Sequence, residues 1–387
     1  MKEHTMAEIL SFKIEIPDSA IEDLQRRLDA ARFPEAEPLD DWSQGLPLNY
    51  ARELTTYWRE EYDWRAREAY LNRHPQFKTN IDGLDIHFVH CVSPHPGARP
   101  LLITHGWPGS VVEFHKVIDP LVDPVAHGGN AEDAFHVVCP SLPGYGFSDK
   151  PTQTGWGVEK IAEAWNVLML RLGYESYLAQ GGDWGSAVTT AIGIQNKGAC
   201  VGLHVNMPNA GATKEALANP DEADKRALAG AAYYQQWGAG YSKQQSTRPQ
   251  TLGYGLVDSP VGQAAWIIEK FYEWTDCDGH PENVLTKDEL LDNVMYYWWQ
   301  GNGASSARLY WESFGSAFGG GNDNTVKVPT GCSIFPKEIV PTPRSWAKNR
   351  YPNIVYWNEL DKGGHFAAFE QPELFVAELR ACFAVMR

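Results

Sequence analysis

The sequence lacks long apolar stretches and has no excess of basic residues. Nowhere do about 18 consecutive apolar residues occur, so no segment predicts a transmembrane helix. The first dozen residues, MKEHTMAEILSF, also lack the apolar core of a secretory signal. A formal net charge of −16 disfavours a phosphate-backbone partner. We therefore predict a soluble, cytoplasmic protein with no transmembrane anchor and no nucleic-acid partner, while a homo-oligomer is left open.

Cysteine is scarce and widely spaced. The six cysteines never occur in C-x-x-C spacing, which predicts reduced, buried thiols and neither a zinc site nor a disulfide framework. At 387 residues and 43% hydrophobic residues, the chain is long enough to bury a large core. Its length allows two domains or one elaborated domain.

The pattern of apolar residues changes along the chain. Residues 1–75 begin with a capped amphipathic helix after Pro17 and continue into a segment rich in Trp and Tyr, which we interpret as a meander. Residues 77–90 alternate around Asp82-Gly83 and predict a hairpin. Short apolar runs at 101–104, 135–140, 177–180 and 201–206 then alternate with helical stretches at 159–172 and 186–195. This alternation predicts an α/β fold with a mostly parallel sheet and helices on both faces.

Strand signals stop after Pro208 and return only near Gly331. The intervening stretches 216–234, 261–274 and 285–314 have helical character and many aromatic residues. Strand signals at 331–336 and 353–357 follow, and a final helix is predicted over 372–386. We expect a core formed by residues 76–207 and 329–387, with residues 208–328 as an inserted helical lid.

One short motif carries most of the chemical information. Gly181-Gly182-Asp183-Trp184-Gly185 follows an apolar run and leads directly into a helix, the G-x-nucleophile-x-G spacing of a strand-to-helix elbow. Aspartate is a common helix cap, but here the flanking glycines favour a nucleophile. No serine in the chain has glycine at both −2 and +2. A carboxylate that attacks a saturated carbon forms an ester that water can cleave, which predicts displacement at a C–O or C–halogen bond.

The order Asp183, Glu338, His365, with His105-Gly106-Trp107-Pro108 upstream, resembles the α/β-hydrolase-fold epoxide hydrolases of the microsomal-like branch. The resemblance covers nearly the whole chain, including the N-terminal meander. It implies the α/β-hydrolase fold, hydrolysis of an epoxide to a diol, and no cofactor or metal.

A second glycine motif does not indicate a nucleotide site. Gly144-Tyr145-Gly146 begins like a dinucleotide fingerprint, but the third glycine is missing, and we interpret the segment as a surface loop.

His365 lies in a glycine turn between the last strand and the last helix, where it would act as the base that activates water. Glu338, at the end of the preceding strand, is the preferred partner that orients this base, although Glu359 and Asp361 are nearer in sequence. The backbone amides of Trp107 and Trp184 would form the oxyanion hole that the fold implies. Both indoles are also expected to line the substrate pocket.

Ring opening of an epoxide requires an acid beside the departing oxygen, and a phenol stays protonated at neutral pH. Two lid tyrosines characterise the family, and Tyr241 and Tyr310 occupy the matching positions. Both are expected to line the pocket as well. Because the chain has 17 tyrosines, four more candidates for this role are kept open. These are Tyr233, Tyr234, Tyr296 and Tyr297.

We therefore expect an epoxide hydrolase that acts on a small hydrophobic epoxide, of terpene, lipid or xenobiotic origin, with water as the second substrate. A haloalkane dehalogenase shares the fold and the aspartate, but it has no use for two lid phenols. The third interpretation is an inactive homologue that binds a hydrophobic ligand. The intact Asp, Glu and His set argues against it.

Overall fold

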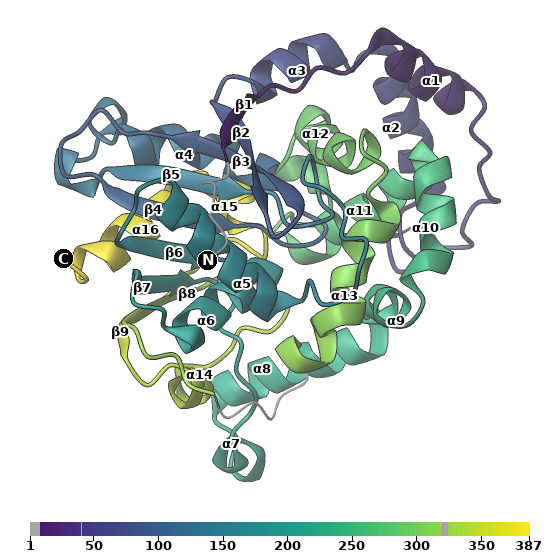
Figure 1. Ribbon diagram of the computed structural model, residues 1–387. Helices are drawn as coiled ribbons and strands as arrows, with labels where there is room; N and C mark the ends of the chain where they lie inside the picture. Colours follow the sequence, from purple (N-terminus) through teal and green to yellow (C-terminus); the bar gives the residue numbers. More distant parts are fainter. Residues whose placement is uncertain (1–7, 40, 319–323) are drawn as a thin grey trace.

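The computed structural model describes residues 8–39, 41–318 and 324–387. A nine-stranded sheet runs through its centre in the order β1-β2-β3-β5-β4-β6-β7-β8-β9 (Figure 1). The strands are β1 Ile9–Phe12, β2 Gln76–Ile81, β3 Leu84–Cys91, β4 Arg99–Thr104, β5 Phe135–Pro140, β6 Tyr177–Gly181, β7 Cys200–Val205, β8 Thr330–Ile334 and β9 Ile354–Glu359. The pairs from β1 to β3 and the β3–β5 pair are antiparallel, and all pairs from β5 to β9 are parallel. The predicted hairpin and the mostly parallel sheet are confirmed.

Helices cover both faces of the sheet, which explains why its central strands are continuous apolar runs. Figure 1 shows α5 and α6 in front of the sheet and α4 and α16 behind it. The helices of this core are α4 His115–Val122, α5 Val158–Arg171, α6 Asp183–Gln195, α14 Arg344–Arg350, α15 Ala367–Glu370 and α16 Pro372–Ala384. The residues of β6 are buried throughout, and α6, which follows it, packs against β4, β6 and β7.

A run of helices lies between β7 and β8. These inserted helices are α7 Lys214–Ala218, α8 Glu222–Tyr233, α9 Gly240–Thr247, α10 Pro249–Asp258, α11 Pro260–Trp274, α12 Lys287–Trp298 and α13 Gly303–Phe318. Two long helices predicted from the sequence are each divided. The first breaks before Pro220, because a residue that precedes proline disfavours the helical conformation. The second is interrupted by a turn over residues 299–302.

The N-terminal segment packs against the inserted helices. It contains α1 Asp18–Asp29, α2 Leu48–Glu60 and α3 Trp64–Leu71, so the predicted meander is more regular than expected. The helix α2 has an apolar stripe, because Tyr50, Leu54 and Trp58 recur every four residues and bury one face of the helix. α1 and α2 contact α11, and α2 also contacts α12. The Tyr62 hydroxyl donates to Asp292 at 2.8 Å, which ties this segment to α12.

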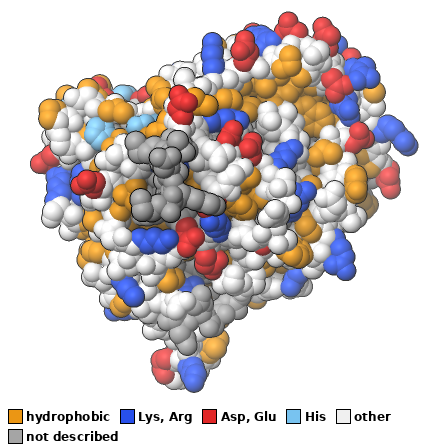
Figure 2. Space-filling view, in the orientation of Figure 1, with side chains coloured by type: hydrophobic (Ala, Val, Ile, Leu, Met, Phe, Trp, Pro, Cys, Tyr) orange, Lys and Arg blue, Asp and Glu red, His pale blue; other side chains and the backbone are white. Residues whose placement is uncertain are grey.

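The surface carries charges of both signs. Figure 2 shows lysine and arginine side chains scattered among acidic ones over this face, without an extended basic area on it. All six cysteines are buried and unpaired, as predicted. Among the described residues, no helix is long and apolar enough to cross a lipid bilayer.

Candidate active site

Asp183 stands at the junction between β6 and α6. Its φ of 49° lies in the left-handed region, which is unusual for a residue other than glycine and costs conformational energy. Its carboxylate Oδ1 accepts a hydrogen bond from the Trp107 amide at 2.7 Å. The predicted strand-to-helix elbow is present.

Two glycines allow this elbow to lie against the neighbouring strand. A Cβ on Gly185 would lie 1.8 Å from the Thr104 carbonyl oxygen, and a Cβ on Gly106 would lie 2.1 Å from Asp183 Oδ1. Neither position has room for a side chain. Glycine is therefore required here by close approach, and the loop after β4 can place its amide against the carboxylate.

His365 reaches Asp183 from the loop between β9 and α15. Its backbone amide donates to the Trp274 carbonyl at 2.9 Å, which fixes the loop against the end of α11. Its Nε2 lies 3.3 Å from Asp183 Oδ2, and its side chain is almost fully buried. The imidazole is therefore buried and faces the Asp183 carboxylate.

Glu338 lies on the other side of the imidazole. Its Oε1 is 2.6 Å from His365 Nδ1 and also accepts the Ile339 amide at 2.8 Å. A β-bridge between Lys337 and Gly364 joins the two loops and sets this contact. Glu359, which is nearer to the histidine in sequence, is half exposed and pairs with Arg226 at 3.7 Å. The structure thus brings Asp183, His365 and Glu338 together in one chain of contacts.

The charges in this chain of contacts control the imidazole. Burial alone would lower the pKa of His365, but the carboxylates of Glu338 and Asp183 outweigh it and raise that pKa well above its usual value. The charged form of the ring is favoured while both neighbours carry negative charge. Any reaction that neutralises Asp183 would remove part of this effect.

A cavity of about 520 Å³ opens above Asp183 between the sheet edge and the inserted helices. Tyr241 of α9 and Tyr310 of α13 line it, with ring centroids 5.7 Å apart. Burial raises the pKa of both phenols well above the ordinary value of about 10, so both keep their protons at neutral pH. The remaining wall is mostly apolar and includes Met207, Phe314, Phe318, Ile339 and Val340.

The two predicted tryptophans support the cavity from behind. The Trp107 ring stacks on Tyr241 at 4.7 Å, and Trp184 meets Tyr310 edge to face at 4.8 Å. Neither indole lines this cavity, but Trp107 contributes to the lining of a smaller cavity beside Asp183 and His365. Both rings are buried, and they hold the two phenols in place through packing.

Tyr234 is part of the site, although the sequence favoured Tyr241 and Tyr310 over it as acids. It also lines the cavity, and its hydroxyl lies 3.2 Å from that of Tyr241. Tyr297 and Tyr233 lie outside this cavity: Tyr297 donates to the Gly109 carbonyl at 2.6 Å, and Tyr233 is 58% exposed. A π-helical turn over Tyr234–Gly238 places Tyr234 beside Tyr241, and no pattern in the sequence predicted that turn.

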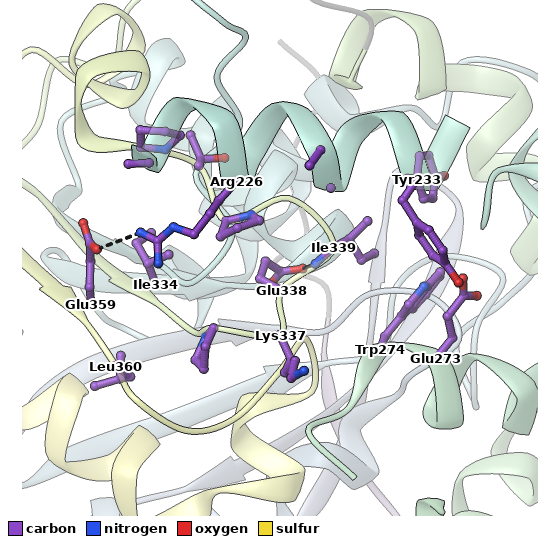
Figure 3. Close-up of a pocket in the computed structure, with 18 residues that line it drawn as sticks. Arg226, Tyr233, Glu273, Trp274, Ile334, Lys337, Glu338, Ile339, Glu359 and Leu360 are labelled. Atoms are coloured by element: carbon purple, nitrogen blue, oxygen red, sulfur yellow. Dashed lines mark hydrogen bonds and ion pairs between the residues drawn. The ribbon is translucent and has the colours of Figure 1, made fainter. Parts of the chain in front are cut away.

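A second cavity, of about 500 Å³, lies on the other side of Tyr234 and Ile339, which line both spaces. Figure 3 shows it between α8 and the loop that carries Lys337, Glu338 and Ile339, with Trp274 on its far wall. The ion pair of Arg226 and Glu359 closes one end of it (Figure 3). Glu359 is thus engaged with Arg226, whereas Glu338 contacts His365.

A much smaller cavity, of about 20 Å³, lies beside Asp183 and His365. This is room for a single water molecule, and Gln180 and Glu113 contribute polar side chains to its lining. Burial raises the pKa of Glu113 to about 8, which favours its neutral form at neutral pH, and no pattern in the sequence indicated this acid. Within residues 8–39, 41–318 and 324–387, no group of three or more His, Cys, Asp or Glu side chains is arranged to hold a metal ion.

The fold and the elbow define the class of the protein as an α/β hydrolase. The family profile described as alpha/beta hydrolase fold matches residues 99–255, and the one described as epoxide hydrolase N terminus matches residues 9–114. Juvenile hormone epoxide hydrolase from the silkworm Bombyx mori superposes with a TM-score of 0.90 at 35% identity, over 98% of this chain and 95% of the other. Aspergillus niger epoxide hydrolase gives a TM-score of 0.87 at 32% identity, over 98% and 97% of the two chains.

Sequence relatives agree with the structural ones. Epoxide hydrolase 1 of Sus scrofa is 40% identical over 400 residues, covering 96% of this chain and 88% of its own. A Stigmatella aurantiaca protein, provisionally assigned as an epoxide hydrolase, is 55% identical over 98% of this chain and 86% of its own. The chain belongs to the epoxide hydrolase family of α/β hydrolases, and it is an enzyme of that class.

Proposed function

We propose that the enzyme converts a hydrophobic epoxide to a vicinal diol through an ester on Asp183. The observation that carries this proposal is the position of the Asp183 carboxylate: one oxygen accepts the Trp107 amide, the other faces His365, and two phenols share its cavity. Asp183 attacks one ring carbon while the C–O bond of the ring breaks. Tyr241 and Tyr310 supply the proton that the departing oxygen needs.

Ester formation changes the state of His365. Before the reaction, the negative charges of Asp183 and Glu338 raise the pKa of the imidazole. The ester is neutral, so one of these charges disappears and the ring releases its proton, which restores the phenol. The imidazole thereby becomes a base at the moment when the ester must be cleaved.

Hydrolysis then proceeds from the side of the base. His365, held by Glu338 at 2.6 Å, takes a proton from water, and the hydroxide adds to the carboxyl carbon of Asp183. The amides of Trp107 and Trp184 stabilise the oxyanion. The acyl C–O bond breaks, and the departing alkoxide takes the carboxyl proton. The diol leaves, while Asp183 and the imidazolium return to their first states.

The composition of the cavity supports a hydrophobic substrate. Apart from Asp183 and the tyrosines, Phe314, Phe318 and Met207 provide apolar contact area. We propose that residues 208–328 serve as the lid, because α9 and α13 supply the two phenols. Residues 1–75 would brace this lid through α11 and α12.

Two assays test the proposal together. A panel of styrene oxides, terpene epoxides and fatty-acid epoxides is compared with haloalkanes of matched size, and diol and halide release are measured. We expect diol and no halide. Halide release would establish a dehalogenase, and neither product would favour a binding protein.

The His365→Gln variant provides the second assay. It should still form the ester and fail to hydrolyse it, so intact mass spectrometry should detect an adduct equal in mass to the epoxide. Active wild-type enzyme whose His365→Gln variant gives no adduct would contradict the two-step mechanism. Asp183→Asn serves as the control, since it should give neither adduct nor diol.

A further inference from the structure

Tyr234 is connected to the proposed acid Tyr241 by a hydrogen bond that the catalytic cycle above does not use. Its hydroxyl lies 3.2 Å from the Tyr241 hydroxyl and 3.0 Å from Ser242 Oγ. The two tyrosine rings meet at 76° with their centroids 6.4 Å apart. Tyr234 therefore contacts Tyr241 through its hydroxyl and leaves the Tyr241 ring stacked on Trp107.

Counting protons determines what the Tyr234 hydroxyl can do. The Ser242 hydroxyl has one proton, which it donates to the Ala239 carbonyl at 2.9 Å. Ser242 can therefore only accept from Tyr234. The single proton of Tyr234 thus has two acceptors within reach, Ser242 Oγ and the Tyr241 oxygen.

The reaction makes one of these acceptors stronger. As Tyr241 gives its proton to the ring oxygen, negative charge develops on the Tyr241 oxygen in a buried site. Lys270 lies 5.0 Å from the centre of the Tyr241 ring, but it is paired with Glu269 at 2.8 Å and Glu273 at 2.9 Å. Its charge is therefore largely compensated, and a direct hydrogen bond to the phenolate oxygen is the stronger stabilising contact.

We propose that Tyr234 is a positioning residue whose hydroxyl turns from Ser242 Oγ to the Tyr241 oxygen as the epoxide opens. By donating a hydrogen bond to the Tyr241 oxygen while negative charge develops there, it makes Tyr241 the stronger acid of the two phenols. The inference rests on the proposed function and adds a third tyrosine to it. Tyr234 acts only through Tyr241 and does not touch the reacting carbon.

Tyr234→Phe is the appropriate variant because it removes only the hydroxyl. Tyr234 lines both cavities, and phenylalanine keeps the aromatic ring in this position. Tyr233→Phe is the matched control, since Tyr233 is adjacent and 58% exposed. Melting curves establish that each variant folds.

Single-turnover reactions with styrene oxide, quenched and analysed by intact mass, give the alkylation rate and the ester hydrolysis rate separately. Tyr234→Phe should slow alkylation about tenfold, the effect of one hydrogen bond to a charged group, and leave hydrolysis within about twofold. Tyr233→Phe should change neither rate. In a Tyr241→Phe background, adding Tyr234→Phe should slow alkylation by no more than about twofold.

Ser242→Ala tests the same idea in the opposite direction. It removes the competing acceptor, so alkylation should become about two- to threefold faster. Alkylation at or below the wild-type rate in this variant would overturn the inference, and so would equal slowing of both steps by Tyr234→Phe. A further tenfold loss in the Tyr241→Phe background would do the same.

If wild-type enzyme forms no adduct and no diol, the proposed function itself fails. Normal wild-type kinetics with an unaffected Tyr234→Phe variant would reject this inference alone.

Discussion

Replacing Glu338 with glutamine should separate the two chemical steps. Glu338 contacts His365 Nδ1 at 2.6 Å, and both side chains are about 1% exposed. Glutamine keeps the size and one hydrogen-bonding oxygen but removes the charge. The Glu338 charge stabilises the imidazolium that forms during hydrolysis. The glutamine variant therefore loses this stabilisation in the hydrolysis step and not in alkylation.

The magnitude follows from the charge and its burial. At an effective dielectric constant of about 20, unit charges about 4 Å apart attract by about 4 kcal/mol. The net value of a hydrogen bond to a charged group is about 1.5–3 kcal/mol. Taking about 2–3 kcal/mol, we expect ester hydrolysis to slow about 30- to 150-fold, while alkylation changes less than about threefold. The ester should therefore accumulate during turnover.

The pH dependence of hydrolysis provides an independent test, because it predicts the direction in which the pH–rate profile should move. In the ester only the Glu338 charge still raises the pKa of His365. Hydrolysis needs the neutral ring, so the hydrolysis rate rises as the pH passes the His365 pKa of the ester from below. Without the charge the pKa is lower. The acid limb of the hydrolysis profile should then move to lower pH, although its plateau falls.

Rapid quench and intact mass spectrometry measure both steps, and Glu359→Gln is the control. Glu359 is half exposed and pairs with Arg226, so its variant should keep both rates. The reasoning would be refuted if Glu338→Gln kept its hydrolysis rate within threefold, or if Glu359→Gln showed the larger defect.

Two further changes test different parts of the site. Combining Tyr241→Phe and Tyr310→Phe should abolish alkylation as followed by intact mass, whereas each single change should only slow it; normal adduct formation in the double variant would show that other groups supply the proton. Gly106→Ala should lower alkylation more than about 100-fold without loss of folding, because its Cβ would lie 2.1 Å from Asp183 Oδ1 and displace the carboxylate. Gly211→Ala, where a Cβ meets nothing within 4 Å, is the control, and an unimpaired Gly106→Ala variant would count against the described elbow.

Local patterns in the sequence predicted the elements that place Asp183. The apolar run 177–180 and the glycines around Asp183 sufficed for β6, the elbow and α6, because all of this information lies within a few residues. The chain order also placed Glu338 and His365 at adjacent strand ends. Their contact, however, depends on the Lys337–Gly364 bridge between two loops, for which no local pattern exists.

The parts that sequence reasoning missed depend on packing between distant segments. β1 has only four residues and forms through pairing with β2, about 67 residues later in the chain. The Trp184 ring of α6 meets the Tyr310 ring of α13 edge to face at 4.8 Å, a contact between distant segments that no periodicity in either helix indicates. Tyr234 reaches Tyr241 only because a π-helical turn joins α8 to α9.

The covalent ester on Asp183 is the central claim, and isotope labelling tests it most directly. Excess enzyme is allowed one turnover in water enriched in oxygen-18, and the diol and the peptide containing Asp183 are weighed separately. Because the hydroxide adds to the carboxyl carbon, the heavy oxygen should appear in the Asp183 side chain and be absent from the first diol released. A first diol that carries the label, with none in Asp183, would contradict the account.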